Sequence, residues 1–447
     1  MSFSRRKDEN TSFYISFEAH SVSDGTLSYR LENLWVIVPV GGRATRLLPL
    51  TAETSKACIR LVNRPLIEIS LLCLASQGIR NFVFGVKGYT NYRSLHDHFD
   101  SGVGFSAQYG ISPRIHIKYQ PNVEDFGSGD SARINMEYYD IEDPIFAVQG
   151  DNIFDVDINS LIAFHKEKGG IMSIGLNAVK DVTGYGVAEV DDNMRISRFV
   201  EKPKPEEAPS NLANTGLYML SPEIREVLSS EKIRKLTERK NRLDFGYDVI
   251  PFLLQEGYPV YGYVLSGNWY DVGTPERYLE AMQDILHGKL DCLQDFDGKV
   301  EEKATLWIQG ETPASIRRRE EILRKMREGR IDLQGAVMIG RHCQINDGAH
   351  IVDSCIDNYT VVGKNASIEN SAIMDRVFVG DNAQIAQSIV GRHVTVKSTS
   401  SKPTKIEKVT TIADDVTIAA GSRLLASKIY PHLQISEGNY EGITVKT

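Results

Sequence analysis

Two glycines and two cations close together predict a polyphosphate site in the N-terminal half of the chain. Gly41 and Gly42 follow the apolar run 36–40, and glycine lets backbone N–H groups approach an anion without a Cβ in the way. Arg46 and Lys56 follow and add side-chain positive charge. The spacing fits neither the Walker loop nor the G-x-G-x-x-G dinucleotide loop. From these residues alone, an ordinary strand and turn with surface cations is the alternative.

The elements that would position these groups alternate between short apolar runs and helix-like segments over residues 34–290. The expected strands are 35–40, 82–86, 115–119 and 145–149, with a helix over 65–77. This alternation is typical of βαβ units and predicts an α/β fold with a Rossmann-like, mixed, mostly parallel sheet covered by helices. Ligands of such sheets bind at the carboxyl ends of strands. Gly41-Gly42 stand where the first strand ends, so the fold agrees with the site.

The glycine loop resembles a family signature. The string 41–51, Gly-Gly-Arg-Ala-Thr-Arg-Leu-Leu-Pro-Leu-Thr, with Lys56 and Asn63-Arg64-Pro65-Leu66-Ile67-Glu68 beyond it, resembles the sugar-1-phosphate nucleotidyltransferases, the NDP-sugar pyrophosphorylases. The resemblance implies catalytic roles for Arg46 and Lys56 and nucleotide binding by Gly41, Gly42 and Thr45. Two departures stand out: the family usually has Gly at Ala44, and Pro-Lys-Pro where this chain has Ser55-Lys56-Ala57. The methyl group of Ala44 would push the loop back or weaken activity.

The same resemblance implies a metal site. Asp151 stands in 146–154, an apolar run that ends in Gly-Asp, and Asp271 stands in 267–275. Phosphoryl chemistry on a nucleotide requires a divalent cation to offset the phosphate charges, so Mg²⁺ is the expected cofactor, bound by these two aspartates. Either aspartate alone would more commonly be a helix cap or a turn residue.

Three further strings, 183–189, 200–203 and 211–218, resemble the half of the family's site that holds the sugar phosphate. By that match the sugar-phosphate ligands are Gly186, Glu201, Lys202, Asn214 and Thr215. Glu-Lys-Pro at 201–203 can also be read as a solvated strand end. The strings 120–121 and 127–132 resemble the base-contacting loop and imply that Gln120 and Gly127 bind the nucleotide. Asp130 would be unfavourable near phosphates unless its carboxylate points away or reaches metal.

The implied reaction joins an NTP and a hexose 1-phosphate to give an NDP-sugar and pyrophosphate. A phosphate oxygen of the sugar attacks the α-phosphorus in line, and no general base is required. Residues 150–154 and 210–218 look most like glucose-1-phosphate thymidylyltransferases, whereas 245–251 and 260–263 look more like mannose-1-phosphate guanylyltransferases. Glucose or mannose 1-phosphate, with dTTP, UTP or GTP, therefore remain the expected substrates.

A repeat follows in the C-terminal part. Aliphatic residues fall in triplets that restart every 17 residues, as at Ile339, Ile356, Ile373 and Val390. Small or β-branched residues follow four positions after most of these aliphatic residues. Antiparallel strands would alternate with period two instead. The pattern resembles the hexapeptide repeat of left-handed parallel β-helices, and it is interrupted over 397–411, which is expected to be an extruded loop.

Composition limits the remaining functions. The 447 residues carry a net charge of -8, which gives no general attraction for nucleic acid. No apolar run is long enough for a membrane span, and 1–33 lacks the core of a secretion signal, so a cytoplasmic protein is expected. The five cysteines have no Cys-x-x-Cys spacing and are expected to be thiols, mostly buried. Cys58 is near Lys56 but is expected to be a packed residue.

The expected organisation is an N-terminal extension, a nucleotidyltransferase domain, a linker with a charged solvated helix, a left-handed β-helix and a tail, over 1–33, 34–290, 291–332, 333–430 and 431–447. Homo-oligomerisation through the β-helix is expected. Two alternatives stay open. One is a catalytically weak, sugar-nucleotide-binding regulatory subunit that acts through its β-helix. The other is an added acetyltransferase activity using His342, His350 or His393, although an unreactive surface histidine is the more common finding.

Overall fold

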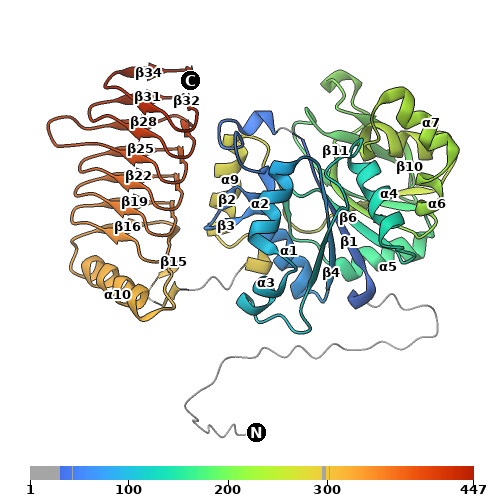
Figure 1. Ribbon diagram of the computed structural model, residues 1–447, viewed down its shortest axis with the longest axis horizontal. Coiled ribbons are helices and arrows are strands. Elements are labelled where there is room, and N and C mark those ends of the chain that lie inside the picture. Colours follow the sequence, from blue (N-terminus) through green and yellow to red (C-terminus); the bar gives the residue numbers. More distant parts are fainter. Residues whose placement is uncertain (1–30, 43, 294–297, 302, 447) are drawn as a thin grey trace, which may run out of the picture.

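The computed structural model describes residues 31–42, 44–293, 298–301 and 303–446. Figure 1 shows two bodies of different architecture side by side, an α/β domain and a stack of short strands. This confirms the expected fold class, an α/β domain with a mixed sheet followed by a left-handed parallel β-helix. The described helices contain none that is both long and apolar enough to cross a membrane.

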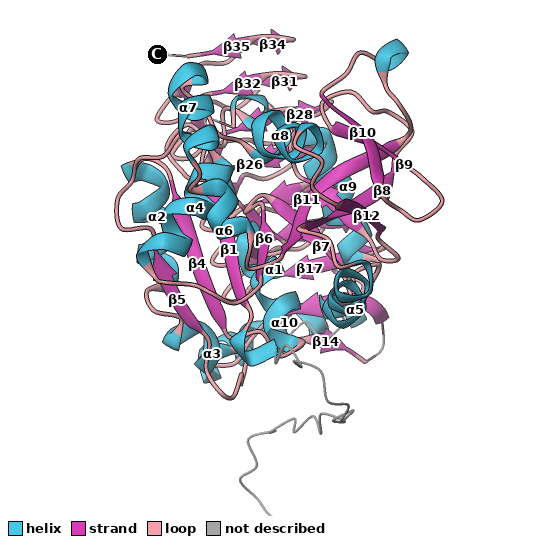
Figure 2. Cartoon of the chain, turned by 90° about the vertical axis from the view of Figure 1, so that its right-hand side faces the viewer, coloured by secondary structure: helices cyan, strands magenta, loops and turns pink. Residues whose placement is uncertain are grey.

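The sheet of the α/β domain has nine strands. Its parallel part consists of β1 (Trp35–Val40), β4 (Asn81–Val86), β5 (His116–Tyr119) and β6 (Ile145–Val148). Figure 2 shows these strands side by side in the order β5, β4, β1, β6. The sheet continues beyond β6 with β11 (Leu212–Leu220), β8 (Met172–Ala178), β9 (Gly186–Val190), β10 (Ile196–Glu201) and β12 (Val260–Val264). Since β11 runs antiparallel to β6, the sheet is mixed.

Helices cover both faces of this sheet. Neighbouring residues of β1 enter different cores, because side chains alternate across a strand. Val36 and Val38 lie in one core and Ile37 in the other. The first core contains α1 (Leu66–Ser76), α2 (Tyr89–Phe99), α3 (Val103–Gln108) and α5 (Ile158–Lys168); the second contains α4 (Ser128–Tyr138), α6 (Ile224–Leu228), α7 (Glu231–Lys240) and α8 (Ile250–Gln255). Burial on both faces explains the continuous apolar runs in the sequence.

The β-helix consists of three parallel sheets. The first sheet, whose edge strand β14 (Lys299–Val300) pairs antiparallel with its neighbour, contains the parallel strands β15 (Lys303–Ile308), β17 (Val337–Ile339), β20 (Cys355–Ile356), β23 (Ala372–Ile373), β26 (Ile389–Val390), β29 (Thr411–Ile412), β32 (Lys428–Ile429) and β35 (Thr444–Val445). The second contains β16 (Asp332–Gln334), β19 (His350–Val352), β22 (Ser367–Glu369), β25 (Gln384–Ala386), β28 (Lys405–Glu407), β31 (Arg423–Leu425) and β34 (Asn439–Glu441). The third contains β18 (Gln344–Ile345), β21 (Val361–Val362), β24 (Phe378–Val379), β27 (Thr395–Val396), β30 (Thr417–Ile418) and β33 (Gln434–Ile435).

The 17-residue frame of the sequence is the pairing register of these sheets. Ile339 pairs with Ile356, Ile356 with Ile373, and Ile373 with Val390. The aliphatic side chains stack in a single buried cluster along the axis. One coil therefore corresponds to one repeat, as the pattern predicted.

One corner of the β-helix carries a residue with left-handed backbone in each coil. We call these residues the corner column; they are His342, Tyr359, Arg376, His393, Asp415 and His432, with φ between 57 and 61°. Neighbours in the column touch: the rings of His342 and Tyr359 stack at 4.9 Å, and His393 lies 3.8 Å from Asp415. His350, on the second sheet, pairs with Asp332 at 2.9 Å. The three candidate acetyltransferase histidines thus all have neighbours on the surface of the coil.

The structure differs from the expected boundaries of the repeat. Pairing resumes at β28, so the extruded loop covers 397–404 rather than 397–411. Ile406 is the single buried interior residue of β28, and it stands between Lys405 and Glu407. A single apolar residue between two charged ones does not indicate a strand in the sequence. Coils also continue through β33, β34 and β35, within residues that were expected to form a tail.

The expected linker is also structured. Strand β15 pairs with β17 and so belongs to the first sheet. The charged helix is α10 (Pro313–Arg327), which Figure 1 places at one end of the coil stack. Its few apolar residues close that end, since Ile322 lies in the β-helix core with Leu323 and Met326 packed against it. The sparse apolar stripe of this helix explains why it was expected to be solvated.

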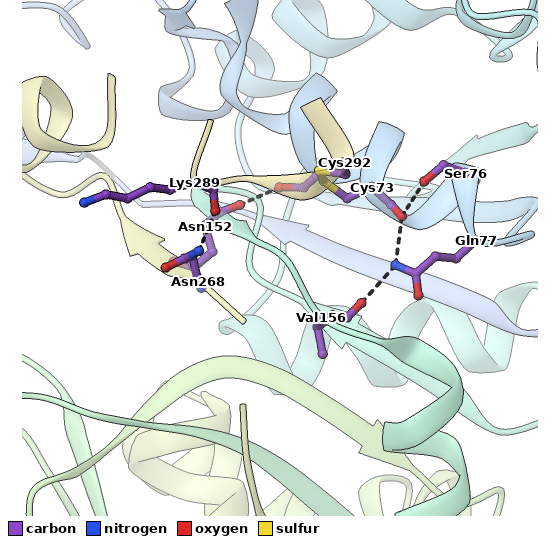
Figure 3. The surroundings of a disulfide bond; sticks show 9 residues. Cys73, Ser76, Gln77, Asn152, Val156, Asn268, Lys289 and Cys292 are labelled. Atoms are coloured by element: carbon purple, nitrogen blue, oxygen red, sulfur yellow. Dashed lines mark hydrogen bonds between the residues drawn. A yellow bond between two sulfur atoms is a disulfide. The ribbon is translucent and has the colours of Figure 1, made fainter. Parts of the chain in front are cut away.

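The cysteines are not all thiols. Cys73 of α1 and Cys292 form a disulfide (Figure 3). It spans 219 residues of sequence, and the two Cα atoms lie 5.2 Å apart. Sequence spacing gave no sign of this pair because the fold, rather than a local motif, brings the two cysteines together. Cys343 and Cys355 are buried thiols as expected, and burial raises the pKa of the Cys58 thiol to about 12.

Candidate active site

A cavity of about 860 Å³ opens where the parallel strands end. Its walls come from five segments that contribute residues after β1, after β4, at the start of α4, after β6 and after α7: 39–42, 85–91, 125–131, 149–151 and 240–244. Residues 55–57 close one side. The cavity thus lies at the carboxyl edge of the sheet, where the sequence placed the ligand.

The glycine loop turns sharply at this edge. Gly41 and Gly42 line the cavity, and Gly42 has a φ of 94°, which favours glycine. Ala44 also has a left-handed backbone, with φ 41° and ψ 45°, and its carbonyl accepts a hydrogen bond from the Thr51 hydroxyl at 3.0 Å. The family's usual glycine would take this conformation without the cost that a Cβ brings. The short helix η2 (Thr45–Leu47), which contains Thr45 and Arg46, begins immediately afterwards.

Lys56 and the two aspartates meet at one point. The Lys56 ammonium lies 2.6 Å from Oδ2 of Asp151 and 3.6 Å from Oδ1 of Asp271. Asp151 precedes β7 (Asn152–Phe154), which pairs with β13 (Trp269–Asp271) so that Asp271 faces Asn152. This small two-stranded sheet brings together carboxylates that are far apart in the sequence.

The electrostatics of this cluster favour the ionised form of Asp151. Burial by itself would raise the pKa of Asp151, but the charge and hydrogen bond of Lys56, with Arg46 farther away, hold that pKa below its ordinary value. Arg277 of α9 (Pro275–Leu286) donates from Nη1 to Oδ2 of Asp271 at 2.8 Å. The guanidinium of Arg46 lies against Gly273, where a Cβ would come 3.1 Å from Nη2. Both expected cations are therefore close to the two expected metal ligands.

The sugar-phosphate candidates lie at the start of β9, at the end of β10 and within the first half of β11. A Cβ on Gly186 would come within 2.5 Å of the Glu201 carboxylate, so glycine permits a close approach. Burial raises the pKa of Glu201, against the lowering effect of Lys202. Lys202, itself at φ 49°, is half-exposed, with its ammonium 3.9 Å from Glu201 and 5.2 Å from the ring centre of Tyr247.

Asn214 and Thr215 are placed differently. The Asn214 amide donates to the Tyr218 hydroxyl at 2.9 Å and accepts from the Gly216 N–H at 3.0 Å. Thr215 is buried, and its hydroxyl donates to the carbonyl of Gly175 at 2.7 Å. Neither residue lines the cavity, and the hydrogen bonds of both side chains fix the backbone of β11 instead.

The two base-contacting candidates, Gly127 and Gln120, have different surroundings. Gly127 lines the cavity, but Gln120 is buried, and its oxygen accepts from the Ser131 hydroxyl at 2.7 Å. The amide nitrogen of Gln120 donates to the carbonyl of Asn122 at 3.0 Å, so Gln120 holds the cavity loop from behind. Asp130 points away from the cavity, as its compatibility with phosphates required. It pairs with Arg133 at 2.7 Å.

Sequence reasoning missed several charged residues at the site. Lys87 follows β4 and lines the cavity, where its ammonium donates to the carbonyl of Asp125 at 2.6 Å. Its place immediately after a buried strand was a usable signal. Arg242 also lines the cavity and lies 4.3 Å from the ring centre of Tyr247. Neither Arg242 nor Arg277 follows a predicted strand, so the sequence pattern gave no such signal for them.

The fold and the site together define a nucleotide-binding α/β domain joined to a β-helix. The family model described as nucleotidyl transferase matches residues 36–288, and a model described as the LbH domain of the EIF2B epsilon subunit matches 324–436. Because the first match covers more than half of the chain, the chain belongs to the nucleotidyl transferase family, as an enzyme of the sugar-1-phosphate nucleotidyltransferase class.

Curated relatives match between 56% and 74% of this chain. A UTP--glucose-1-phosphate uridylyltransferase of Synechocystis sp. is 28% identical over 74% of this chain and 84% of its own length. A glucose-1-phosphate adenylyltransferase of Clostridium novyi is 28% identical over 58% of this chain and 68% of its own. The low-salt glycan biosynthesis nucleotidyltransferase Agl11 of Haloferax volcanii is 28% identical over 56% and 65%.

Proposed function

We propose that the chain makes an NDP-sugar and pyrophosphate from an NTP and a hexose 1-phosphate, either glucose or mannose 1-phosphate with dTTP, UTP or GTP. The observation that carries the proposal is the meeting of Lys56, Asp151 and Asp271 beside the glycine loop at the cavity edge. Two relatives are named for transfer to glucose 1-phosphate, which supports that sugar first.

The triphosphate would lie along Gly41 and Gly42, whose backbone can approach an anion closely. Arg46 and Lys56 would offset its charge, and Thr45 would add the start of η2 to the cradle. The base would lie toward Gly127 in the same cavity. Gln120 would act there by fixing the loop 122–125 instead of reading the base edge.

Mg²⁺ fits the residues present. Asp151 and Asp271 both direct a carboxylate oxygen at one ammonium, an arrangement that supports their sharing of a single cation. Carboxylates are the ligands Mg²⁺ prefers, and the phosphates of a nucleotide commonly complete its shell. When bound, the metal would neutralise charge on the phosphates and align the attacking and leaving oxygens. Arg277 would keep the Asp271 carboxylate oriented through its hydrogen bond to Oδ2.

The sugar phosphate would bind at the neighbouring strand ends. Lys202 is half-exposed and can meet a phosphate, while the Glu201 carboxylate can accept hydrogen bonds from sugar hydroxyls. The absence of a Cβ on Gly186 lets the Glu201 carboxylate pack against its backbone and would hold that carboxylate in place for the sugar. Asn214 and Thr215 would hold the pocket wall in place.

In the reaction, an oxygen of the sugar phosphate attacks the α-phosphorus and pyrophosphate leaves on the opposite side. The attacking phosphate is already ionised near neutral pH, so no side chain has to remove a proton. The chain contributes positioning and charge neutralisation, through Arg46 and Lys56 on the triphosphate and Lys202 on the sugar phosphate.

The test is pyrophosphate release with a panel of NTPs against glucose, mannose and N-acetylglucosamine 1-phosphates in the presence of Mg²⁺. We expect one NTP and one sugar phosphate to dominate, with Asp151→Asn inactive on the same pair. Nucleotide binding by calorimetry without pyrophosphate release from any pair would instead favour the regulatory alternative. The strained Ala44 is the residue that supports this alternative.

We further propose that the protein acts in the cytoplasm and forms a homo-oligomer through the β-helix. Large side chains such as Tyr359 and Phe378 are exposed on the coil surface, at 53% and 46%, and would lose that exposure in an assembly. Light scattering of the full chain, compared with a Phe378→Ser variant, would measure the molar mass. A monomeric parent chain would contradict the oligomer.

A further inference from the structure

The loop that carries Arg46 and Lys56 has little regular structure of its own. Between residues 44 and 65 the described elements are η2, η3 (Lys56–Cys58) and the two-residue strands β2 (Arg60–Leu61) and β3 (Arg64–Pro65). Such short elements cannot fix the position of a long side chain by themselves. The position of residues 44–65, which we call the phosphate loop, therefore depends on the elements that the loop packs against.

The phosphate loop packs on the first sheet of the β-helix. Leu47, Leu50 and Ile59 share one buried cluster with Trp307 of β15 and Met338 of β17. The same cluster extends along the sheet to β20, β23 and β26, and on the other side it contains residues of α1 and α9. Figure 1 shows β2, β3 and α9 at the border between the two domains. The apolar support of the loop is thus shared between the domains.

A charged pair crosses the same border. The guanidinium of Arg60 binds the Asp357 carboxylate through Nε and through Nη2, the latter 3.0 Å from Oδ1. Only 3% of the Asp357 side chain is exposed. A buried carboxylate that loses its partner is left uncompensated, which is strongly unfavourable. This pair therefore fixes where Arg60 can lie relative to the coil.

Arg60 is close to Lys56 along the backbone. The N–H of Ile59 donates to the Lys56 carbonyl at 3.1 Å, closing the turn of η3. The carbonyl of Arg60 accepts from the Tyr278 hydroxyl of α9, and Nη2 of Arg60 also donates to the carbonyl of Asn63. A displacement of Arg60 would consequently move the turn that aims the Lys56 ammonium at Asp151.

Other contacts hold the loop at both sides of η3. His432 of the corner column lies 2.9 Å from the Glu53 carboxylate. Asn63 donates to the side-chain oxygen of Gln309 at 3.2 Å and accepts from the Cys355 thiol at 3.0 Å. The β-helix thus contacts the phosphate loop at Glu53, which precedes Lys56, and at Asn63, which follows it. The shared apolar cluster supports the loop between these two contacts.

We propose that Arg60 and Asp357 are positioning residues for nucleotidyl transfer, through which the β-helix holds the phosphate loop so that Lys56 meets the triphosphate. The β-helix is then part of the catalytic apparatus. This inference rests on the proposed function, because it assigns the Lys56 ammonium to the nucleotide. It predicts that a substitution at Asp357 changes the kinetic constants for the NTP and leaves KM for the sugar phosphate unchanged.

The test is Asp357→Asn in the full chain, with steady-state kinetics for each substrate. We expect KM for the NTP to rise at least 10-fold or kcat to fall by that factor, while KM for the sugar 1-phosphate stays within 2-fold. Amide exchange over 44–60 should become faster, and Asp357→Glu should recover part of the activity. The control is Asp332→Asn, which removes the exposed pair with His350 in the second sheet and should leave both KM values unchanged.

The outcomes separate this inference from the proposed function. A parent chain that releases no pyrophosphate would refute the proposed function itself. An active parent with Asp357→Asn at parental kcat and KM for the NTP would overturn the positioning role alone. If Asp357→Asn fails to fold, Arg60→Lys replaces it, since lysine keeps the charge but loses the two-point contact. A folded Arg60→Lys with parental kinetics would likewise overturn the role.

Discussion

The ammonium of Lys56 lies 2.6 Å from the Asp151 carboxylate and reaches Asp271 at 3.6 Å. A single cation from the phosphate loop therefore contacts both candidate metal ligands. The relationship makes the two functions of the site interdependent, because the residue expected to bind the triphosphate also contacts both residues expected to bind Mg²⁺ and lowers the pKa of Asp151. Binding of a metal–nucleotide complex would redistribute these contacts.

Substituting Lys56 with methionine keeps most of the side-chain volume and removes its charge. We expect pyrophosphate release to fall by about 100-fold or more, since a preorganised charge at the reacting phosphates is lost. The pKa of Asp151 should rise, because the charge of Lys56 is the main influence that lowers it. Steady-state kinetics and thermal unfolding provide the measurements. Lys232→Met, at an exposed pair with Glu256, is the control; parental turnover by Lys56→Met would contradict the role.

Ala44→Gly should stabilise the protein. The left-handed backbone at Ala44 costs an L-residue roughly 1–2 kcal/mol. Glycine avoids this cost, but it loses more conformational entropy on folding than alanine does, which costs about 0.5–1 kcal/mol. We expect a net gain of about 0.5 kcal/mol in the free energy of unfolding, with undiminished activity. Urea denaturation measures it. Ala208→Gly, at φ -66°, should destabilise instead, and a destabilised Ala44→Gly would show that its methyl group makes a useful contact.

Lys202→Ala should separate the two substrates kinetically. A hydrogen bond to a charged group contributes about 1.5–3 kcal/mol, so KM for the sugar 1-phosphate should rise by roughly 10-fold or more while KM for the NTP is retained. Lys204→Ala removes an exposed lysine from the same segment and is the matched control. Equal increases in both KM values would place Lys202 outside the sugar-phosphate pocket.

His165 should make stability depend on pH. Burial lowers its pKa to about 4, and its ring lies between the hydroxyls of Ser173 and Ser221 at 2.8 and 2.9 Å. The unfolded chain binds a proton near pH 6.5, so the contribution is complete above that pH and is lost as the pH falls toward 4. The loss amounts to about 3 kcal/mol.

Unfolding of the parent chain and of His165→Gln at pH 7.5, 5.5 and 4.5 measures this contribution. The variant should lose less stability than the parent chain on acidification. His116→Gln, at an exposed ring, should behave like the parent chain. Identical pH profiles for the parent chain and His165→Gln would contradict the assignment.

The sequence predicted most of the fold because buried positions carry apolar residues at regular intervals along the chain. Strand β1 was expected over 35–40 and has those bounds, and β6 differs by one residue. The coil was readable because its interior accepts only aliphatic residues at fixed positions. Prediction failed at β28, where one interior residue stands between charged ones, and at α10, whose apolar stripe is too narrow to distinguish from a solvated helix.

The positions of site residues were predictable where they stand at strand ends. They were less predictable where the direction of the side chain determines whether a residue faces the cavity. Asp151 and Asp271 converge through the pairing of β7 with β13, in agreement with their positions at strand ends. Gln120 also ends a strand, yet its amide turns inward to Ser131. The Cys73–Cys292 disulfide depends on the tertiary path of the chain and leaves no local pattern.

The β-helix also sets the distance between two of its contacts with the α/β domain. Its first sheet meets the phosphate loop near β15, and its corner column meets Glu53 at His432, several coils farther along. Each coil advances about 4.8 Å along the axis. Gain or loss of one 17-residue coil between these points would preserve the β-helix itself yet shift one contact past its partner. The number of coils is therefore set by the neighbouring domain and cannot vary freely as in an isolated solenoid.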